Sequence, residues 1–501
     1  MVELCTRYAK AESELKEQQL RVKNYWIRTD VQLKFVQSIA HTLDEEHQEI
    51  QCETVEMLAS KLKIAVDRIK SVTKSKSSCS EEVQVKRVKY VVLQQKIEKA
   101  VQDLEHWQRM FDPSWYLIMK AATPQIDAEL KTCKLQAVAT AADSHAPISS
   151  AQSLRSALAS VSTIGNEIRV FLRKDSLESV QLHNIPLCSA RVGRRQDPDK
   201  LPIILDQYKP SPEVNIKQLQ KDVRDFARKL AHSSALEFGF LNCKGVIKEN
   251  PDGLTAFTFV FRVPLGFTQP RSLRSCFQDG RGTDSLSDRF KLANELARSV
   301  SYVHTFGFVH KNIRPETILL LSGKESSISS AFLIGFDSFR TAEGRTLRKG
   351  DSAWERCLYQ HPSRMGSMAA ADYIMQHDIY SLGVCLLELG LWNSFVVYDD
   401  QELSLPAAGD SEGTNATQSS ILGTDLPQSS FKDRLLSLAR GELRSRMGTR
   451  YSEIVVTCLT CLDPGNIDFG DESEFQDEDG IQVGVRYIEK VSVQEQHYMA
   501  E

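Results

Sequence analysis

The stretch LANELARSVSYVHTFGFVHKNIRPETILL, residues 292–320, decides how the second half of the chain folds. Its first part carries apolar residues at helical spacing, which predicts an amphipathic helix ending at Thr305-Phe-Gly-Phe. A polar His-Lys-Asn follows at 310–312, then Ile-Arg-Pro-Glu-Thr, and then an apolar run of strand length. The order therefore predicts a helix, a polar loop and a strand in succession.

Regular patterns continue on both sides of this stretch. Upstream, residues 256–263 alternate with period two between Gly253 and Pro264, which predicts a strand. Short apolar runs at 168–172 and 201–205 also have strand length, and 214–230 has helical spacing. After Pro270 helical patterns dominate, and the Ser/Thr/Gly-rich residues 403–431 are expected to form a long exposed loop.

Three further motifs follow the polar loop in order along the chain. Leu333-Ile-Gly-Phe-Asp comes about fifteen residues after the polar loop, Tyr359-Gln-His-Pro comes later, and Asp378-Ile-Tyr-Ser-Leu-Gly-Val closes the series. Taken in order, these residues resemble a protein-kinase domain over roughly residues 166–465, with a small lobe to about 265. The resemblance implies structural roles for His310, at the motif histidine, and for Asp378, which would brace the catalytic loop.

The residues that carry chemistry in that family are replaced. The resemblance places Asn312 at the catalytic base and Arg314 at the loop lysine. Thr317 and Gly335 stand at the two magnesium-ligand positions. An amide has no useful basicity, and loss of a general base alone costs about 10²–10⁴ in rate. We therefore expect no competent catalytic residue and no Mg²⁺ site, with Asp337 as an alternative ligand if the loop is shifted.

The parts that would hold a nucleotide are also weak. No Gly-x-Gly-x-x-Gly precedes the third strand, and Lys209 is the candidate for the lysine that pairs with phosphates. Asp222 or Asp225 could replace the helix glutamate that orients such a lysine, but a solvated helix face is preferred for both. No cofactor is expected, although ATP binding is left open.

The first 142 residues carry helical periodicity almost throughout, which predicts a helical bundle. Its apolar stripes should pack in the core, including Ile64, Ile69, Val92 and Ile97. Residues 143–165 are rich in Ala and Ser and suit a linker, and 466–501 form an acidic C-terminal segment. The fold class is therefore α+β, with an all-α bundle followed by a two-lobed kinase-like domain.

The helical part also resembles a known group. Asn24-Tyr-Trp-Ile-Arg-Thr and Leu43-Asp-Glu-Glu-His-Gln are similar to filamentous-fungal proteins that join a HeLo or prion-inhibition-and-propagation type domain to a degenerate kinase-like domain. The resemblance implies a role in heterokaryon incompatibility or cell death through membrane attack. The charged residues of this chain's start, among them Glu3, Arg7 and Lys10, argue against that activity here.

Composition limits the remaining functions. The 501 residues carry a net charge of −4, which gives no sign of a nucleic-acid partner. Eleven scattered cysteines fit a reducing compartment, and no signal peptide or spanning segment is evident, so a cytoplasmic protein is expected. Protein partners are expected, while membrane contact and a homo-oligomer are left open.

Three functions follow from these patterns. The favoured one is a pseudokinase-type signalling or scaffold protein. The second is a Ser/Thr protein kinase with ATP binding and displaced catalytic residues. The third is a cell-death effector acting through the helical domain.

Overall fold

The computed structural model describes most of residues 170–466, apart from short gaps of which the longest are 342–352 and 399–415. In the first 155 residues it describes chiefly 45–73 and 89–101, with single positions between Glu14 and Arg155. The chain divides into two compact units, and the division between Arg155 and Ser156 falls inside the stretch 143–165. Among the described residues, no helix has both the length and the apolar character needed to cross a membrane.

The first unit is helical where it is described. Its longest helix is α2, Glu45–Val72, and a second helical stretch includes residues 89–101. Ile69, Ile97 and Val101 lie in one buried core, as the periodicity predicts. Ile64 and Val92 are exposed, which corrects their assignment to the packed stripes. The core of this unit is formed by the following residues: Leu15, Val22, Ala65, Ile69, Val72, Tyr90, Ile97, Ala100, Val101 and Leu104.

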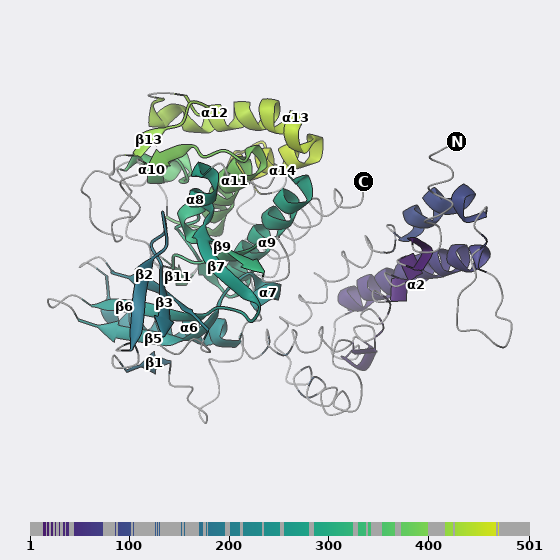
Figure 1. Ribbon diagram of the computed structural model, residues 1–501, viewed down its shortest axis with the longest axis horizontal. Helices are drawn as coiled ribbons and strands as arrows, with labels where there is room; N and C mark the ends of the chain where they lie inside the picture. The colour runs from purple at the N-terminus through teal and green to yellow at the C-terminus, as the bar shows by residue number, and fades with distance from the viewer. Residues whose placement is uncertain are drawn as a thin grey trace. The chain divides into compact units, whose positions relative to one another are not determined.

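The second unit begins with a sheet of six strands, at the lower left of Figure 1. The strands are β1 (Phe171–Leu172), β2 (Val180–Asn184), β3 (Arg191–Arg195), β4 (Ile203–Tyr208), β5 (Asn242–Glu249) and β6 (Ala256–Arg262). Their spatial order is β1-β5-β6-β4-β3-β2, with every pair antiparallel except β1 with β5. Helix α6, Ile216–His232, follows β4 and packs against β5.

Helices dominate the rest of the second unit, as the sequence predicts (Figure 1). The helices are α7 (Ala235–Phe238), α8 (Leu273–Gln278), α9 (Leu286–Thr305), α10 (Trp354–Cys357), α11 (Met375–Leu391), α12 (Phe431–Leu438), α13 (Arg444–Met447) and α14 (Thr449–Leu459). Short helical turns are η5 (Pro315–Thr317), η6 (Pro362–Arg364), η7 (Gln428–Ser430) and the π-helical η8 (Ala439–Leu443). Helix α11 is buried almost throughout and packs against α9 and α14, so it forms the centre of this helical part.

Small sheets connect these helices. The strands β7 (Phe267–Ser272), β9 (Ile318–Gly323) and β10 (Ser329–Leu333) form one sheet in the order β10-β9-β7. Strand β8 (Phe308–Val309) pairs with β11 (Arg340–Thr341), and β12 (Val396–Tyr398) pairs with β13 (Ala416–Gln418). Strand β13 lies inside residues 403–431, and Leu422 there is fully buried, so that stretch is not wholly an exposed loop.

An aromatic cluster connects the six-stranded sheet to the loop after β8. The ring of Phe336 lies 4.7 Å from Phe226 on α6 and 4.8 Å from His310, between ring centres. Phe259 and Phe261 on β6 complete the contact from the sheet, each with its ring centre 6.4 Å from Phe336. Such buried aromatic pairs stabilise a fold beyond the area that they bury. They hold the two parts of the second unit together at the candidate site.

Candidate functional site

The polar loop after β8 is held by one buried carboxylate. Asp378, in the first turn of α11, accepts hydrogen bonds from the backbone N–H groups of His310 (2.7 Å) and Lys311 (2.9 Å). It also accepts from the Tyr373 hydroxyl at 2.6 Å and lies 3.1 Å from His304 Nε2. Burial raises the pKa of this carboxyl, but the hydrogen bond and charge of His304 outweigh it and lower the pKa to about 2. Asp378 therefore fixes the loop backbone as an ionised brace.

His310 supports the same loop from its other side. Its Nε2 lies 3.1 Å from the carbonyl oxygen of Ile334, and its Nδ1 accepts from the N–H of Asn312 at 3.2 Å. Because Nδ1 accepts a hydrogen bond, the single ring proton is on Nε2, which donates a hydrogen bond to the Ile334 carbonyl oxygen. Burial lowers the pKa of His310 to about 4. The ring is therefore neutral and connects the loop to the segment before Gly335.

The side chains at the expected base and lysine positions bind each other. The Nε of Arg314 donates to the Asn312 side-chain oxygen at 2.8 Å, and the Asn312 amide nitrogen donates to the Gly335 carbonyl at 3.4 Å. The Thr317 hydroxyl lies 2.7 Å from the Asn312 carbonyl oxygen. Asn312, Arg314 and Thr317 thus form a closed set of internal contacts. None of these three offers a carboxylate to a hydroxyl proton or a metal ion.

Gly335 has a conformation and a neighbour that exclude a larger residue. Its φ is +82°, in the left-handed region that favours glycine. A Cβ added here would lie 2.3 Å from Thr317 Cγ2 and 2.7 Å from Thr317 Cβ. The two expected magnesium positions therefore pack against each other, and an aspartate does not fit at Gly335 in this backbone.

Asp206 on β4 is the residue that sequence reasoning missed. Strands β2, β3 and β4 form an antiparallel run, and β4 reads Ile-Ile-Leu-Asp-Gln-Tyr. Asp206 in this strand is only 2% exposed. Its Oδ2 accepts from the N–H of Gly335 at 2.8 Å and from the N–H of Phe336 at 3.1 Å. The strand thus presents a buried carboxyl group to the backbone after β10.

The turn between β2 and β3 is buried as well. A kinase would carry its glycine-rich loop here, but this turn contains the buried residues Ile185, Leu187, Cys188 and Ala190. The carbonyl oxygen of Pro186 accepts from the Ser272 hydroxyl at 2.7 Å, which ties the turn to the start of α8. Burial raises the pKa of Cys188 to about 12, and the charges of Asp206 and Glu316 also act on it. The thiol is therefore protonated at neutral pH and packs as part of this apolar turn.

The other predicted residues take different places. Lys209 is exposed and lies directly beyond the end of β4. Asp222 on α6 is buried and accepts from the Gln218 side chain at 2.9 Å, so it does not lie on a solvated face, while Asp225 is half-buried. Asp337 lies outside the described residues.

A second buried polar cluster lies behind the loop. Arg274 on α8 is fully buried, and its guanidinium contacts Glu316 Oε1 at 3.1 Å and Glu388 Oε1 at 2.7 Å. Tyr359 donates to Glu388 at 2.7 Å and Tyr398 donates to Glu316 at 3.0 Å. This set, here called the Arg274 cluster, joins η5, α8, α11, β12 and the turn after α10. No local sequence signal predicts it, because its partners are far apart in the chain.

Asn312, Thr317 and Gly335 offer no carboxylate to a magnesium ion. Among the described residues, no three His, Cys, Asp or Glu side chains gather in a way that could hold a metal ion. The space that a Cβ of residue 335 would occupy is filled by Thr317. Cys458 and Cys461 are both fully buried.

Comparison with known proteins finds kinases over short stretches. Eukaryotic translation initiation factor 2-alpha kinase 1 of Mus musculus is 30% identical over 105 residues, which are 20% of this chain and 16% of the relative. Mitogen-activated protein kinase kinase 7 of Arabidopsis thaliana is 32% identical over 98 residues, 19% of this chain and 30% of the relative. A probable serine/threonine-protein kinase of Saccharomyces cerevisiae is 27% identical over 113 residues, 20% of this chain and 29% of the relative.

The short length of these matches limits which properties of the relatives can be attributed to this chain. The chain spans less than a third of the length of each of these relatives, and no protein-family model matches it. The mixed helix and sheet architecture is compatible with the two-lobed fold of that family. Together, the matches and the architecture support a protein-kinase-like domain in this chain.

Proposed function

We propose that this chain is a pseudokinase-type signalling or scaffold protein, in which the kinase-like domain binds partners and does not transfer phosphate. The observation that carries the proposal is the Asp206 carboxylate bound to the amides of Gly335 and Phe336. A working kinase uses a lysine on this strand to hold phosphates. The aspartate supplies the opposite charge and already has an internal partner.

A negative charge on β4 opposes the binding of a phosphate beside it. The Asp206 carboxylate would repel a phosphate placed near its strand. The turn between β2 and β3 carries buried apolar residues around Cys188, in place of a flexible glycine-rich loop. Both features oppose nucleotide binding independently of the missing catalytic groups.

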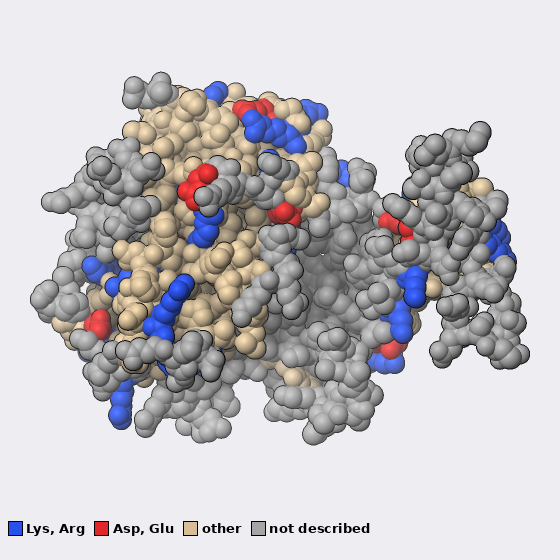
Figure 2. All heavy atoms as spheres, in the orientation of Figure 1, with Lys and Arg blue, Asp and Glu red and all other residues tan. Residues whose placement is uncertain are grey.

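Retained scaffold residues support a binding role. Asp378 and His310 still fix the loop, and Phe336 still joins it to the sheet. The rigid parts of a kinase fold are therefore kept while its reactive groups are lost. On the face shown in Figure 2, the basic and acidic side chains of the described residues are interspersed, which favours protein partners over nucleic acid.

A thermal-shift titration of the full chain with ATP, with and without Mg²⁺, tests the proposal. A ligand present at about 100 times its Kd stabilises a protein by ~2.7 kcal/mol, which moves the melting temperature by several degrees. We expect no shift at millimolar ATP. Asp206→Asn is the matched variant, since it keeps a hydrogen-bond acceptor and removes the charge. A Mg²⁺-dependent shift together with radiolabel transfer from ATP to a generic protein substrate would contradict the proposal.

The second candidate is a Ser/Thr protein kinase with displaced catalytic residues. The names of the three relatives and the retained brace at Asp378 favour it. Its test is Asn312→Asp in the full chain, because a carboxylate at this position could accept from Arg314 and serve as a base. A gain of phosphate transfer by this variant would support the kinase candidate. If the variant transfers no more phosphate than the unmodified chain does, the result supports the binding role instead.

A further inference from the structure

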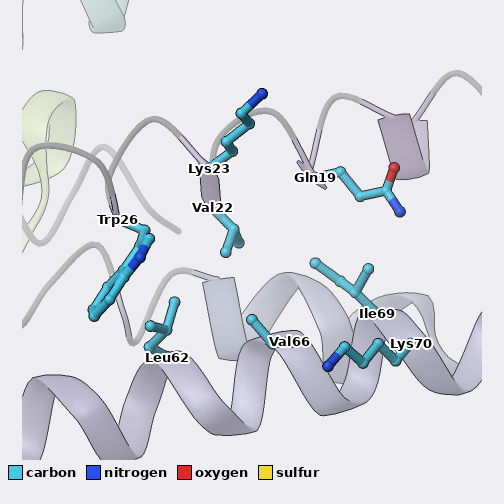
Figure 3. A pocket seen from close by; sticks show the side chains of 8 residues that line it. All are labelled: Gln19, Val22, Lys23, Trp26, Leu62, Val66, Ile69 and Lys70. Atoms are coloured by element: carbon cyan, nitrogen blue, oxygen red, sulfur yellow. The ribbon is translucent and has the colours of Figure 1, made fainter. Parts of the chain in front are cut away.

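An open apolar groove lies in the first unit, between two helical stripes (Figure 3). One stripe is Leu62, Val66, Ile69 and Lys70 on α2, at the spacing i, i+4, i+7 and i+8. The other stripe is Gln19, Val22, Lys23 and Trp26, each of which is helical. The groove has a volume of about 390 Å³. Pockets that hold ligands or anchor side chains fall in the range of roughly 300–1,000 Å³.

The floor of the groove is apolar and belongs to the core. Val22 and Ile69 are buried members of that core, and Leu62 and Val66 pack against it while remaining partly exposed. Each stripe extends over about two helical turns, so its two ends are roughly 11 Å apart at a rise of 1.5 Å per residue. Two parallel ridges of this length leave a space into which a further helix can pack.

Among the described residues that line the groove, the charged side chains are both lysines. Lys23 and Lys70 are both exposed and flank the apolar floor from opposite stripes (Figure 3). Trp26, 37% exposed, closes one end with a large aromatic face. Aromatic side chains that are partly exposed beside apolar pockets are typical anchors of protein interfaces. The rim therefore selects an occupant that is apolar in its centre and acidic at its margins.

We propose that this groove docks an amphipathic helix of a partner protein, with apolar side chains at i, i+3 or i+4 and i+7 and with Glu or Asp flanking them. The apolar positions would lie over Val66 and Ile69, and the acidic residues would pair with Lys23 and Lys70. Charge complementarity of this kind fixes the register and raises the association rate. The inference concerns the helical unit and does not depend on whether the kinase-like domain is catalytic.

The test uses the full chain and two synthetic helical peptides with fluorescent labels. Both peptides carry the same Leu positions, and one has Glu where the other has Lys. We expect the Glu peptide to bind at least tenfold more tightly in fluorescence polarisation. Reversal of both lysines, Lys23→Glu with Lys70→Glu, should invert this preference, whereas Lys23→Arg with Lys70→Arg should keep it. Lys16→Glu with Lys63→Glu is the matched control on exposed lysines outside the groove.

Carbodiimide coupling locates the contact. The reagent joins a peptide carboxylate to a lysine ammonium with loss of water, so cross-links to Lys23 or Lys70 are expected by mass spectrometry. Equal binding of both peptides would overturn the proposal, because it would mean nonspecific apolar adhesion. Binding to phosphatidylserine vesicles that displaces the peptide and requires Lys23 and Lys70 would also overturn it, since the groove would then belong to a lipid surface. Circular dichroism of each variant verifies that the helices are retained.

Discussion

The Asp206 carboxylate lies 2.8 Å from the backbone nitrogen of Gly335, so a strand of the six-stranded sheet and the segment after β10 share one charge-assisted contact. The same oxygen also accepts from the N–H of Phe336 at 3.1 Å. Because Asp206 is only 2% exposed, these two hydrogen bonds hold its buried carboxyl group between the sheet and the segment after β10.

Asp206→Ala should destabilise the second unit by about 2–4 kcal/mol. The substitution leaves the buried N–H groups of Gly335 and Phe336 without their acceptor, and each such group costs roughly 1–3 kcal/mol. Urea unfolding monitored by fluorescence measures the change. Gln207→Ala is the control, because Gln207 is half-buried on the opposite face of the same strand. Equal losses for both variants would show that the carboxylate contact contributes nothing beyond strand packing.

Gly335→Ala should cost more than a positive φ alone explains. Gly335 combines a φ of +82° with a Thr317 Cγ2 atom 2.3 Å from any added Cβ. Gly307 has a φ of +77° and open space around it, so Gly307→Ala reports the backbone strain without the clash. Overpacking adds typically 1–3 kcal/mol. We expect the difference between the two variants to fall in that range in urea unfolding.

The crowding around Gly335 also determines whether an aspartate, as a magnesium ligand, can be introduced at this position. Gly335→Asp carries the same Cβ clash and a charge beside Asp206, so it should yield less folded protein and no magnesium binding. Isothermal titration with Mg²⁺ checks this. A stable Gly335→Asp variant that binds the ion would show that the Thr317 neighbourhood can open.

Periodicity predicted much of this fold because the pattern is local. Helix α6 and strand β6 lie within two residues of their predicted ranges, and helix α9 ends at Thr305 as predicted but begins six residues before the stretch at 292. His310 and Asp378 could also be placed, because their motifs have fixed neighbours. The exposed Val92 shows the limit, since helical spacing alone does not say which of two adjacent faces is covered.

The contacts that close the site could not be predicted in this way. Asp206 and Gly335 are 129 residues apart, and nothing in either local sequence indicates that the two residues meet. One signal existed, because an aspartate inside an otherwise apolar strand requires a partner. Strand β13 was hidden for a related reason, since its Ser/Thr-rich sequence pairs with β12 across a long separation.

Acid should destabilise the second unit between about pH 6.5 and pH 4. Burial lowers the pKa values of His310, His361 and His377 to about 4, from 6.5 in the unfolded chain. Their stabilising contribution is complete above pH 6.5, and it is lost as the pH falls, because the unfolded state takes up protons first. A shift of this size corresponds to about 3 kcal/mol per histidine at its full extent. Urea unfolding at a series of pH values measures the slope.

One hydrogen-bonded chain links His361 to His377. The Nδ1 of His377 accepts from the Ile374 N–H at 2.9 Å, its Nε2 lies 3.2 Å from the Ser363 hydroxyl, and that hydroxyl lies 2.8 Å from His361 Nδ1. Both Nδ1 atoms are acceptors, so protonation breaks the chain. The nearby charges of Lys432 and Asp463 at His361, and of Arg364 and Asp378 at His377, oppose each other.

His361→Asn isolates one member of that chain. Asparagine keeps an oxygen that can accept from the Ser363 N–H, as His361 does, but it does not titrate. The slope of unfolding free energy against pH should fall by about a third of the three-histidine total. His183→Asn on the exposed strand β2 should leave the slope unchanged. An equal effect of both variants would exclude burial as the cause.

Arg274→Met should be among the most damaging single changes in the kinase-like domain, at about 3–5 kcal/mol. It leaves Glu316 and Glu388 buried without their cation, and an uncompensated buried charge is strongly unfavourable. Arg271→Ala is the matched control, because Arg271 pairs with Asp279 at the surface, where such pairs contribute roughly 0–1 kcal/mol. Both losses are measured by urea unfolding at pH 7.5.

A triple variant separates the charge from the packing. Arg274→Met combined with Glu316→Gln and Glu388→Gln removes the whole ionic set, and replacement of a complete buried network is often far less costly than removal of one member. We expect it to regain at least half of the stability lost in Arg274→Met. If the triple variant is no more stable than Arg274→Met, the hydrogen-bond geometry around Tyr359 and Tyr398, and not charge balance, stabilises the Arg274 cluster.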